Sequence, residues 1–162
     1  LMAMPLGAEV EIEGPFGGFV LPQDPSQHLV LLAGGIGITP FRSMVKYAIE
    51  EKLPYTITLL YSNPFPASSA FLDDFSTWEQ GYSNFKMMPT VTNIRAWQDH
   101  DSTWQGKVGR IDAAFVREAV PDMQRPVYYI AGPPLMVRDL GEVLVGIGVS
   151  RDNIKAEEFS GY

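Results

Sequence analysis

Apolar residues gather in short runs along the chain, and longer stretches with a helical repeat separate these runs. Runs rich in β-branched, aromatic and aliphatic residues predict five strands, of which the last is the weakest because it carries two glutamates. The strand ranges are 28–33, 55–61, 85–92, 126–131 and 154–159. Apolar residues recur at helical spacing in 40–52 and 134–147, and shorter helices are expected near 67–79 and 112–120. Because apolar strands alternate with helices, the pattern predicts an α/β fold with a parallel, doubly wound sheet covered on both faces.

The first 25 residues follow a different pattern. Polar and apolar residues alternate in AEVEIEG, a glycine–proline pair and a glycine–glycine pair follow, and a proline-rich connector leads to the first strand of the sheet. This pattern predicts an antiparallel hairpin that belongs to another architecture. Residues 1–25 are therefore set apart from a main domain at 26–162.

A glycine-rich segment, AGGIGITP, follows the first predicted strand. Gly34, Gly35 and Gly37 allow backbone conformations that other residues avoid, and they leave room for an anion to approach the main chain. Thr39 is expected to cap the next helix with its hydroxyl, and Pro40 to occupy the first helical position. The free N–H groups at such a helix start predict a diphosphate-binding site. A tight turn without a ligand is the alternative, since a single glycine cluster is weak evidence.

A second turn of the same kind ends the fourth predicted strand. Gly132, Pro133 and Pro134 close that strand and open a helix, again with a proline at the helix start. The strand ends of a parallel sheet meet at one edge, and ligands bind there close to the point at which the strand order reverses. Two such turns at one edge indicate an extended crevice that suits a dinucleotide.

Composition narrows the possible partners. The sequence holds 12 basic and 19 acidic residues, a net charge of −7, which argues against a nucleic acid or an anionic membrane as the main ligand. No apolar run reaches the roughly 20 residues of a membrane span. The sequence has no cysteine and its two histidines lack ligand spacing, so we expect neither a disulfide nor a metal site. The absence of cysteine fits a cytoplasmic location.

Taken together, these motifs resemble the pyridine-nucleotide domain of the ferredoxin–NADP reductase superfamily. The similarity runs in order from about residue 5 to the last residue. The matching segments are GPFGGFVL, LLAGGIGITPFRSM, TLLYSNP, WQGKVGRID, YYIAGPPLMV and IKAEEFSGY. The resemblance implies a five-stranded parallel sheet of order 3-2-1-4-5. It also implies that residues 1–25 are the remnant of an FAD- or FMN-binding barrel and that residues 26–162 are an NAD(P)-binding domain.

The same resemblance implies an NAD(P)H-dependent flavin oxidoreductase. Hydride passes from NADH or NADPH to FAD or FMN, and electrons then leave singly for a redox partner such as ferredoxin. Tyr162 is implied to stack on the flavin ring and Glu158 to place a polar group near it; the alternatives are a frayed terminal residue and a plain strand-end charge. The residues implied to bind NAD or NADP are Gly34, Gly35, Gly37, Ile38, Thr39, Pro40, Ser62, Asn63, Ala131, Gly132, Pro133, Pro134 and Met136.

The sequence departs from the family pattern near the coenzyme. Ala131 stands where many relatives have a cysteine before the glycine–proline turn. After the second strand there is neither an acidic residue for a ribose 2′-hydroxyl nor an arginine for a 2′-phosphate. Ser62 and Asn63 suit either coenzyme, and the lack of a basic residue there slightly favours NADH. Arg110 either reaches towards a phosphate or pairs with Asp112.

The largest departure concerns the flavin. A flavin-binding barrel needs on the order of 100 residues, as a small domain does, and the first 25 residues cannot supply it. We therefore expect this chain to be inactive alone and to be a fragment of a longer reductase, or to work with a flavin domain that a partner supplies. A second class of function is a non-catalytic module that senses a nucleotide or docks a subunit.

Overall fold

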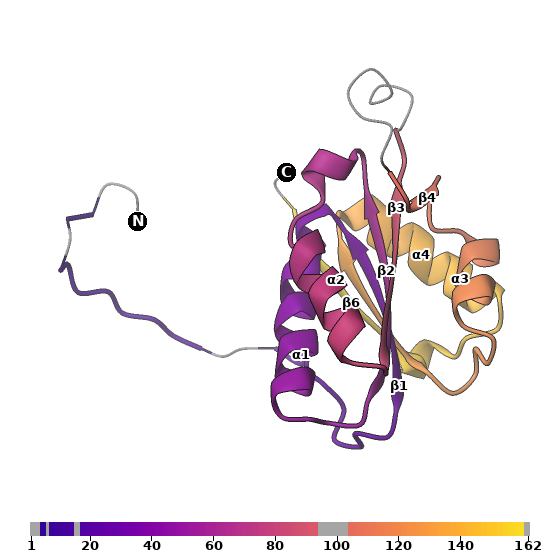
Figure 1. Cartoon of the computed structure of the whole chain (residues 1–162), viewed down its shortest axis with the longest axis horizontal. Coiled ribbons are helices and arrows are strands. Elements are labelled where there is room, and N and C mark those ends of the chain that lie inside the picture. The colour runs from indigo at the N-terminus through magenta and orange to yellow at the C-terminus, as the bar shows by residue number, and fades with distance from the viewer. Residues whose placement is uncertain (1–3, 6, 15–16, 94–103, 161–162) are drawn as a thin grey trace.

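The computed structural model describes residues 4–5, 7–14, 17–93 and 104–160, and its centre is a parallel sheet with helices on both faces (Figure 1). The strand order is β4-β3-β2-β1-β5-β6, and every neighbouring pair is parallel. The strands are β1 (His28–Gly34), β2 (Thr56–Asn63), β3 (Phe85–Val91), β4 (Lys107–Val108), β5 (Val127–Gly132) and β6 (Ile154–Glu158). The helices are α1 (Ile38–Glu50), α2 (Leu72–Gly81), α3 (Ala113–Ala119) and α4 (Pro134–Gly146). Short 3-10 turns complete the connections at η1 (Gly35–Gly37), η2 (Pro66–Ser68) and η4 (Arg151–Asn153).

The doubly wound sheet and the relative order of its five predicted strands are confirmed. The sheet has a sixth strand, β4, which lies beyond β3 at one edge. This strand contains only Lys107 and Val108, so it is too short to show the alternation on which a prediction from sequence depends.

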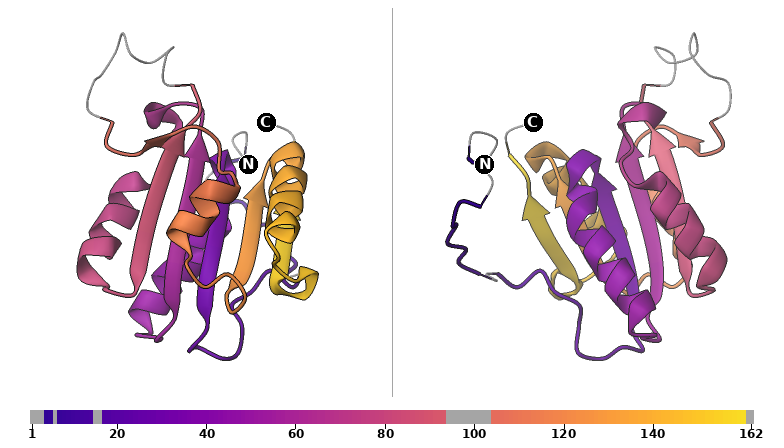
Figure 2. Two further views of the ribbon diagram at one scale, coloured as in Figure 1. Left: turned by 90° about the vertical axis from the view of Figure 1, so that its right-hand side faces the viewer. Right: turned by 60° about the vertical axis from the view of Figure 1, so that its left-hand side comes forward.

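Helices cover both faces of the sheet (Figure 2), and an apolar layer of side chains fills the space on each face. Successive strand side chains point to opposite faces, so Leu29 and Leu31 pack with α1 and α2, whereas Val30 and Leu32 pack with α3 and α4. All four side chains are fully buried. This burial on both faces explains why the strands read as continuous apolar runs. None of the helices in the described ranges has the length and apolar character that crossing a membrane requires.

The N-terminal segment does not form the hairpin that its alternation predicts. No strand occurs among its described residues, 4–5, 7–14 and 17–27, and Val10 and Ile12 are 53% and 86% exposed. A two-stranded hairpin alone is marginally stable in water, and these apolar side chains stay largely exposed to solvent. The origin of the segment in a flavin-binding barrel stays a prediction.

The connector just before β1 does pack against the main body. The ring of Phe19 meets the ring of Tyr129 edge-on, with a centroid distance of 5.2 Å. The Tyr129 hydroxyl donates a hydrogen bond to the Val20 carbonyl oxygen at 2.7 Å. The Tyr55 hydroxyl donates in the same way to the Pro22 carbonyl oxygen. Two tyrosine hydroxyls and the aromatic contacts of Phe19 therefore fix the path by which the chain enters the sheet.

The first residue of β1, His28, is half-buried at the opposite end of the sheet from the glycine turns. Its Nε2 atom lies 2.9 Å from Oγ1 of Thr58. Burial lowers the pKa of the imidazole from its ordinary value of 6.5, and the charge of Asp122 opposes this shift in part. The unfolded chain therefore binds a proton at this residue more readily than the folded chain does.

We predict that this histidine makes folding stability depend on pH. Below pH 6.5 the unfolded chain takes up the proton first, so the free energy of unfolding falls as the pH drops towards the lower folded pKa of His28. Above pH 6.5 His28 is neutral in both the folded and the unfolded chain, so it does not lower the free energy of unfolding there. The His28→Gln variant keeps a polar side chain beside Thr58 but cannot titrate, so it should lose less stability on acidification. Urea denaturation of both proteins at a series of pH values measures this, and a difference between them that stays constant with pH would contradict it.

Candidate functional site

The carboxyl ends of β1, β2 and β5 lie side by side at one edge of the sheet. Gly34 at the end of β1 pairs in register with Ser62 of β2, and Ala33 pairs with Ala131 of β5. The coenzyme-binding residues predicted from the sequence therefore gather at this edge, in the turn after β1, at the end of β2 and in the turn after β5. This is the arrangement that a parallel sheet imposes on its strand ends.

The two glycine-containing turns are in direct contact. An ideal Cβ atom on Gly37 would lie 2.2 Å from the carbonyl oxygen of Ala131, so no side chain fits there. An ideal Cβ atom on Gly34 would lie 2.1 Å from Sδ of Met136. Gly35 has a φ of 53°, in the left-handed region that glycine tolerates best, and open space surrounds its Cβ position. Gly37 is therefore needed for close packing against the main chain, Gly34 leaves room for the Met136 side chain, and Gly35 suits the path of the main chain.

Helix α1 starts earlier than the sequence predicts. The 3-10 turn η1 leads directly into the helix at Ile38, with Gly37 in the N-cap position and no side-chain cap. Thr39 and Pro40 therefore lie inside the first turn, and the predictions of a Thr39 cap and of Pro40 at the first position are wrong. The Thr39 hydroxyl instead donates to the Ile36 carbonyl oxygen at 2.9 Å. Pro40 still fits because the first N–H groups of a helix have no partner within it.

The start of α1 remains open to an anion. Its first turn contains no acidic residue, and no side chain accepts a hydrogen bond from its N–H groups. The helix follows β1, so its positive end lies at the carboxyl edge of the sheet beside the turn after β5. The Ile38 N–H donates to carbonyl oxygens of the preceding turn η1, and Pro40 has no N–H. The positive end of the helix dipole is therefore the feature that attracts a phosphate or diphosphate group here.

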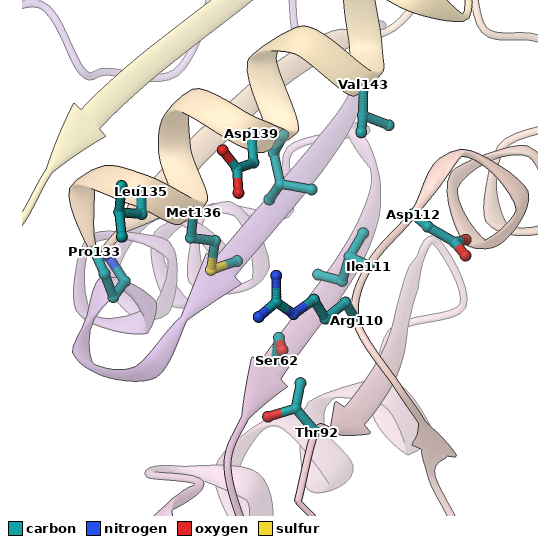
Figure 3. Close-up of a pocket in the computed structure, with 11 residues that line it drawn as sticks. Ser62, Thr92, Arg110, Ile111, Asp112, Pro133, Leu135, Met136, Asp139 and Val143 are labelled. Atoms are coloured by element: carbon teal, nitrogen blue, oxygen red, sulfur yellow. The ribbon is translucent and has the colours of Figure 1, made fainter.

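A cavity of about 460 Å³ lies beside the two turns (Figure 3). It opens between the ends of β2 and β3, the loop before α3 and one face of α4. Of the residues predicted from the sequence, Ser62, Pro133 and Met136 line it. The other lining residues are Thr92, Arg110, Ile111, Asp112, Leu135, Asp139, Leu140 and Val143. The glycine turn does not line the cavity, but Met136 connects the two because it also lies against Gly34.

Most of the cavity wall formed by α4 was not predicted. Met136, Asp139, Leu140 and Val143 are spaced by three or four positions along α4, so they share one face of that helix. The helical repeat could have revealed this shared face. It could not have shown that a cavity lies in front of it, because that depends on where the loop before α3 runs.

Arg110 points into the cavity and does not pair with Asp112 (Figure 3). The Asp112 carboxylate instead caps α3, where it accepts a hydrogen bond from the Phe115 N–H at 2.8 Å. No ion pair of Arg110 is found within the described ranges. Of the two interpretations of this arginine, the pairing with Asp112 is therefore wrong.

Ser62 and Asn63 both end β2 but lie in different surroundings. Ser62 lines the cavity, whereas Asn63 is 3% exposed and is not part of the lining. The Asn63 carbonyl oxygen accepts a hydrogen bond from the Thr92 N–H at 2.9 Å, which ties the end of β2 to the chain leaving β3. Of the two residues, only Ser62 is placed to contact a ligand in this cavity.

Glu158 lies apart from the cavity. It ends β6, pairs in register with Gly132 and is exposed to solvent. It borders a depression between α4 and β6, together with Arg138 and Glu142 on the other face of α4. Tyr162, the second residue predicted to be catalytic, lies outside the described residues. The catalytic roles of both residues stay predictions.

Residues 31–142 match the family described as the oxidoreductase NAD-binding domain. The chain belongs to that family. The matched range includes both glycine turns and Arg110. The resemblance to the NAD-binding domain of the ferredoxin–NADP reductase superfamily is confirmed by this match and by the relatives that share the fold.

Individual relatives agree with this assignment. The chain is 27% identical over 159 residues to a subunit of the Na⁺-translocating NADH-quinone reductase of Methylococcus capsulatus, and 27% identical over 159 residues to the flavohemoprotein of Rhizobium meliloti. These alignments cover 96% and 95% of this chain, but the chain spans only 38% of the length of each of the two curated relatives. The crystal structure of the Amycolatopsis cytochrome P450 reductase GcoB matches 90% of this chain and 42% of its own, with a TM-score of 0.75 and 22% identity. This last similarity confirms the fold.

The close contact between the two turns leads to a test of stability. We predict that Gly37→Ala lowers the free energy of unfolding by about 2 kcal/mol or more, because the added methyl overlaps the Ala131 carbonyl and the main chain must move. Gly35→Ala should cost only about 1 kcal/mol, because its Cβ meets open space and only the left-handed backbone is unfavourable. Urea denaturation measures how far each substitution lowers the free energy of unfolding. Equal costs would show that Gly37 does not pack as described.

Proposed function

We propose that this chain is the coenzyme-binding part of an NAD(P)H-dependent flavin oxidoreductase. In this proposal it binds NADH or NADPH and presents the nicotinamide to FAD or FMN held by a flavin domain, in the same protein or in a partner. Electrons then pass to a redox protein such as ferredoxin. The observation that carries the proposal is the contact between the two strand-end turns, which places an open helix start and a cavity at one sheet edge.

The residues present fit the two halves of a dinucleotide. The start of α1 suits the diphosphate, since neither a capping side chain nor an acidic residue stands at the positive end of its dipole. The cavity lies on one side of this turn, and its volume of about 460 Å³ is in the range of small-molecule sites, so it suits the adenosine half. The turn at Gly132, whose Pro133 also borders this cavity, is left for the nicotinamide half.

The chemistry of hydride transfer belongs to the coenzyme and the flavin: when bound, the reduced nicotinamide supplies a hydride and the flavin ring takes it. The protein's part is to hold and orient the coenzyme. Pro133 and Pro134 have restricted backbones, so the turn that borders the nicotinamide half is rigid. Ala131 packs its carbonyl against Gly37, so the two halves of the site keep a fixed separation.

The names of the relatives support the flavin and the coenzyme. One is part of an NADH-quinone reductase and another is a flavohemoprotein, and the matched crystal structure is a cytochrome P450 reductase. The alternative of a non-catalytic module that senses a nucleotide or docks a subunit finds no support among them. Since the chain spans only 38% of the length of these curated relatives, the activity and the electron acceptor of the whole protein belong to the proposal.

A flavin domain next to this chain would account for its exposed apolar segment. Val10 and Ile12 alternate with acidic residues and are exposed, as expected of a barrel strand without its neighbours. In the proposal, residues 1–25 belong to the flavin barrel and residues 26–162 form the NAD(P)-binding domain. Tyr162 would cover the flavin and Glu158 would place a carboxylate near it. A cytoplasmic location remains an expectation.

A charge placed at the start of α1 tests the diphosphate site. In Thr39→Glu the carboxylate would stand in the first turn of the helix, where it repels a diphosphate but interacts favourably with the helix dipole. Thr39→Gln has nearly the same size without the charge, and both variants lose the hydrogen bond to Ile36. We predict that Thr39→Glu binds NADH and NADPH about tenfold more weakly, or worse, than Thr39→Gln does. Isothermal titration calorimetry of the two variants measures the difference.

Both variants should unfold within about 3 °C of each other, because a charge at a helix terminus contributes less than about 1 kcal/mol. This control separates a loss of binding from a loss of folding. Equal affinities of the two variants for both coenzymes would contradict the diphosphate site at α1, and no binding of either coenzyme by the unmodified chain would contradict the proposed function.

A further inference from the structure

Strand β6 forms one edge of the sheet, and no strand pairs with its outer side within the described ranges. Directly after this strand, the Phe159 N–H donates to the Gly132 carbonyl oxygen of β5 at 2.9 Å. Main-chain groups of successive strand residues point to opposite sides, so the odd-numbered residues of β6 bond towards β5. The N–H and carbonyl groups of Ile154, Ala156 and Glu158 therefore point outwards, to the side where a further strand could pair with them.

The charges of β6 complement a second copy of the same strand. Lys155 and Glu157 lie on the face of the sheet that carries Tyr129, and Nζ of Lys155 is 5.2 Å from the centroid of that ring. Neither Lys155 nor Glu157 forms an ion pair within the part of the chain that the structure describes. When two copies of β6 run antiparallel with Ala156 at the centre, Lys155 of each copy lies directly opposite Glu157 of the other.

The same register also satisfies the main chain. The outward groups of Ile154 then meet those of Glu158 in the second copy, and the groups of Ala156 meet their own copy. Lys155 and Glu157 fall at the positions without hydrogen bonds, where opposite Cα atoms are only about 4.5 Å apart and side chains approach most closely. A shift by one residue would set outward-pointing groups opposite inward-pointing ones and would break this ladder.

Helix α4 carries an unexplained glycine at the same edge of the sheet. Gly141 borders the depression between α4 and β6, beside Arg138 and Glu142. An ideal Cβ atom on Gly141 would meet no atom within 4 Å. Glycine inside a helix costs about 1 kcal/mol relative to alanine. The packing of the single chain therefore does not require a glycine at this position.

A second copy paired through β6 would make use of this glycine. Helix α4 packs on both β5 and β6, and paired strands lie about 4.8 Å apart, so the two copies of α4 would lie roughly 10 Å apart. At that distance helices pack in direct contact, and a residue without a side chain lets them approach. Gly141 and Ala156 border the same depression, so the glycine lies close to the centre of the paired strands.

We propose that β6 pairs antiparallel with β6 of a second copy of this chain, with Ala156 opposite Ala156 and Lys155 opposite Glu157, so that the two sheets form one. The charge pattern of β6 and the open space at Gly141 are independent observations that point to the same partner. The carboxyl edges of the two sheets, and with them the two proposed coenzyme sites, then lie at opposite ends of the dimer. Such a dimer does not depend on the identity of the ligand.

Sedimentation velocity of the full chain over a series of concentrations measures the association. We expect a reversible dimer whose population rises with concentration. Lys155→Glu sets two glutamates opposite each other at both ends of the pairing, so the dissociation constant should rise about tenfold or more. The double variant Lys155→Glu, Glu157→Lys restores opposite charges in the same register, and it should return the dissociation constant to within about threefold of the original. Lys86→Glu makes the same change of charge on β3 and should leave the dissociation constant within about threefold.

Gly141→Gln tests the helix contact without changing the strand. Its side chain enters open space in the single chain, so at concentrations where both proteins are monomers it should melt no lower than the original. In the dimer it should raise the dissociation constant about tenfold or more. Gly146→Gln is the matched control, because Gly146 also lies in α4 with open space at its Cβ position but does not border the depression. It should leave the dissociation constant within about threefold of the original.

Several outcomes would overturn this dimer. A chain that sediments as a monomer at every concentration contradicts it, and so does a double variant that associates no better than Lys155→Glu. If Lys86→Glu weakens the association as much as Lys155→Glu does, the effect is one of overall charge. If serine at Val10 and Ile12 abolishes an association that Lys155→Glu leaves unchanged, the exposed N-terminal segment holds the two copies together and the role of β6 is wrong.

Discussion

The contact between Gly37 and the end of β5 governs the geometry of the whole strand edge. Because the main chain of the first turn lies against the Ala131 carbonyl with no space for a side chain, the start of α1 is held beside the turn that follows β5. Met136 occupies the space over Gly34 in the same manner and also forms part of the cavity wall. One close approach of main chain to main chain therefore sets the relative positions of the helix start, the second turn and the cavity.

This contact also accounts for the open start of α1. With Gly37 in the N-cap position, no side chain is available there to accept hydrogen bonds from the first N–H groups. The nearest hydroxyl, that of Thr39, is used inside the turn on the Ile36 carbonyl. Close packing and the lack of a side-chain cap thus have one cause, a glycine where other helices carry serine or aspartate, and no side chain covers the positive end of the helix.

The sequence predicted what depends on local patterns and missed what depends on distant contacts. The main strands could be found because burial on both faces makes them continuous apolar runs. The strand at Lys107 could not, since it is held by pairing with β3 and by the Trp104 indole N–H on the Lys107 carbonyl, at 3.0 Å. The alternation around Val10 indicated a hairpin, but alternation makes a strand only where a partner covers it. The meeting of the two glycine turns follows from parallel topology alone. The position of Arg110 depends instead on the Thr90–Gly109 hydrogen bond, which no local motif predicts.

The site divides into parts that respond differently to changes of sequence. In the proposed function the diphosphate end is the first glycine turn and the start of α1, whose position depends on the packing of Gly37, so a side chain at Gly37 disturbs the fold itself. The cavity proposed for adenosine is lined by the side chains of Ser62, Thr92 and Arg110, which contribute little to the two apolar layers. A change at Arg110 can therefore alter what the cavity accepts at small cost to stability, since Ile111 and Asp112 hold the main chain in place without it.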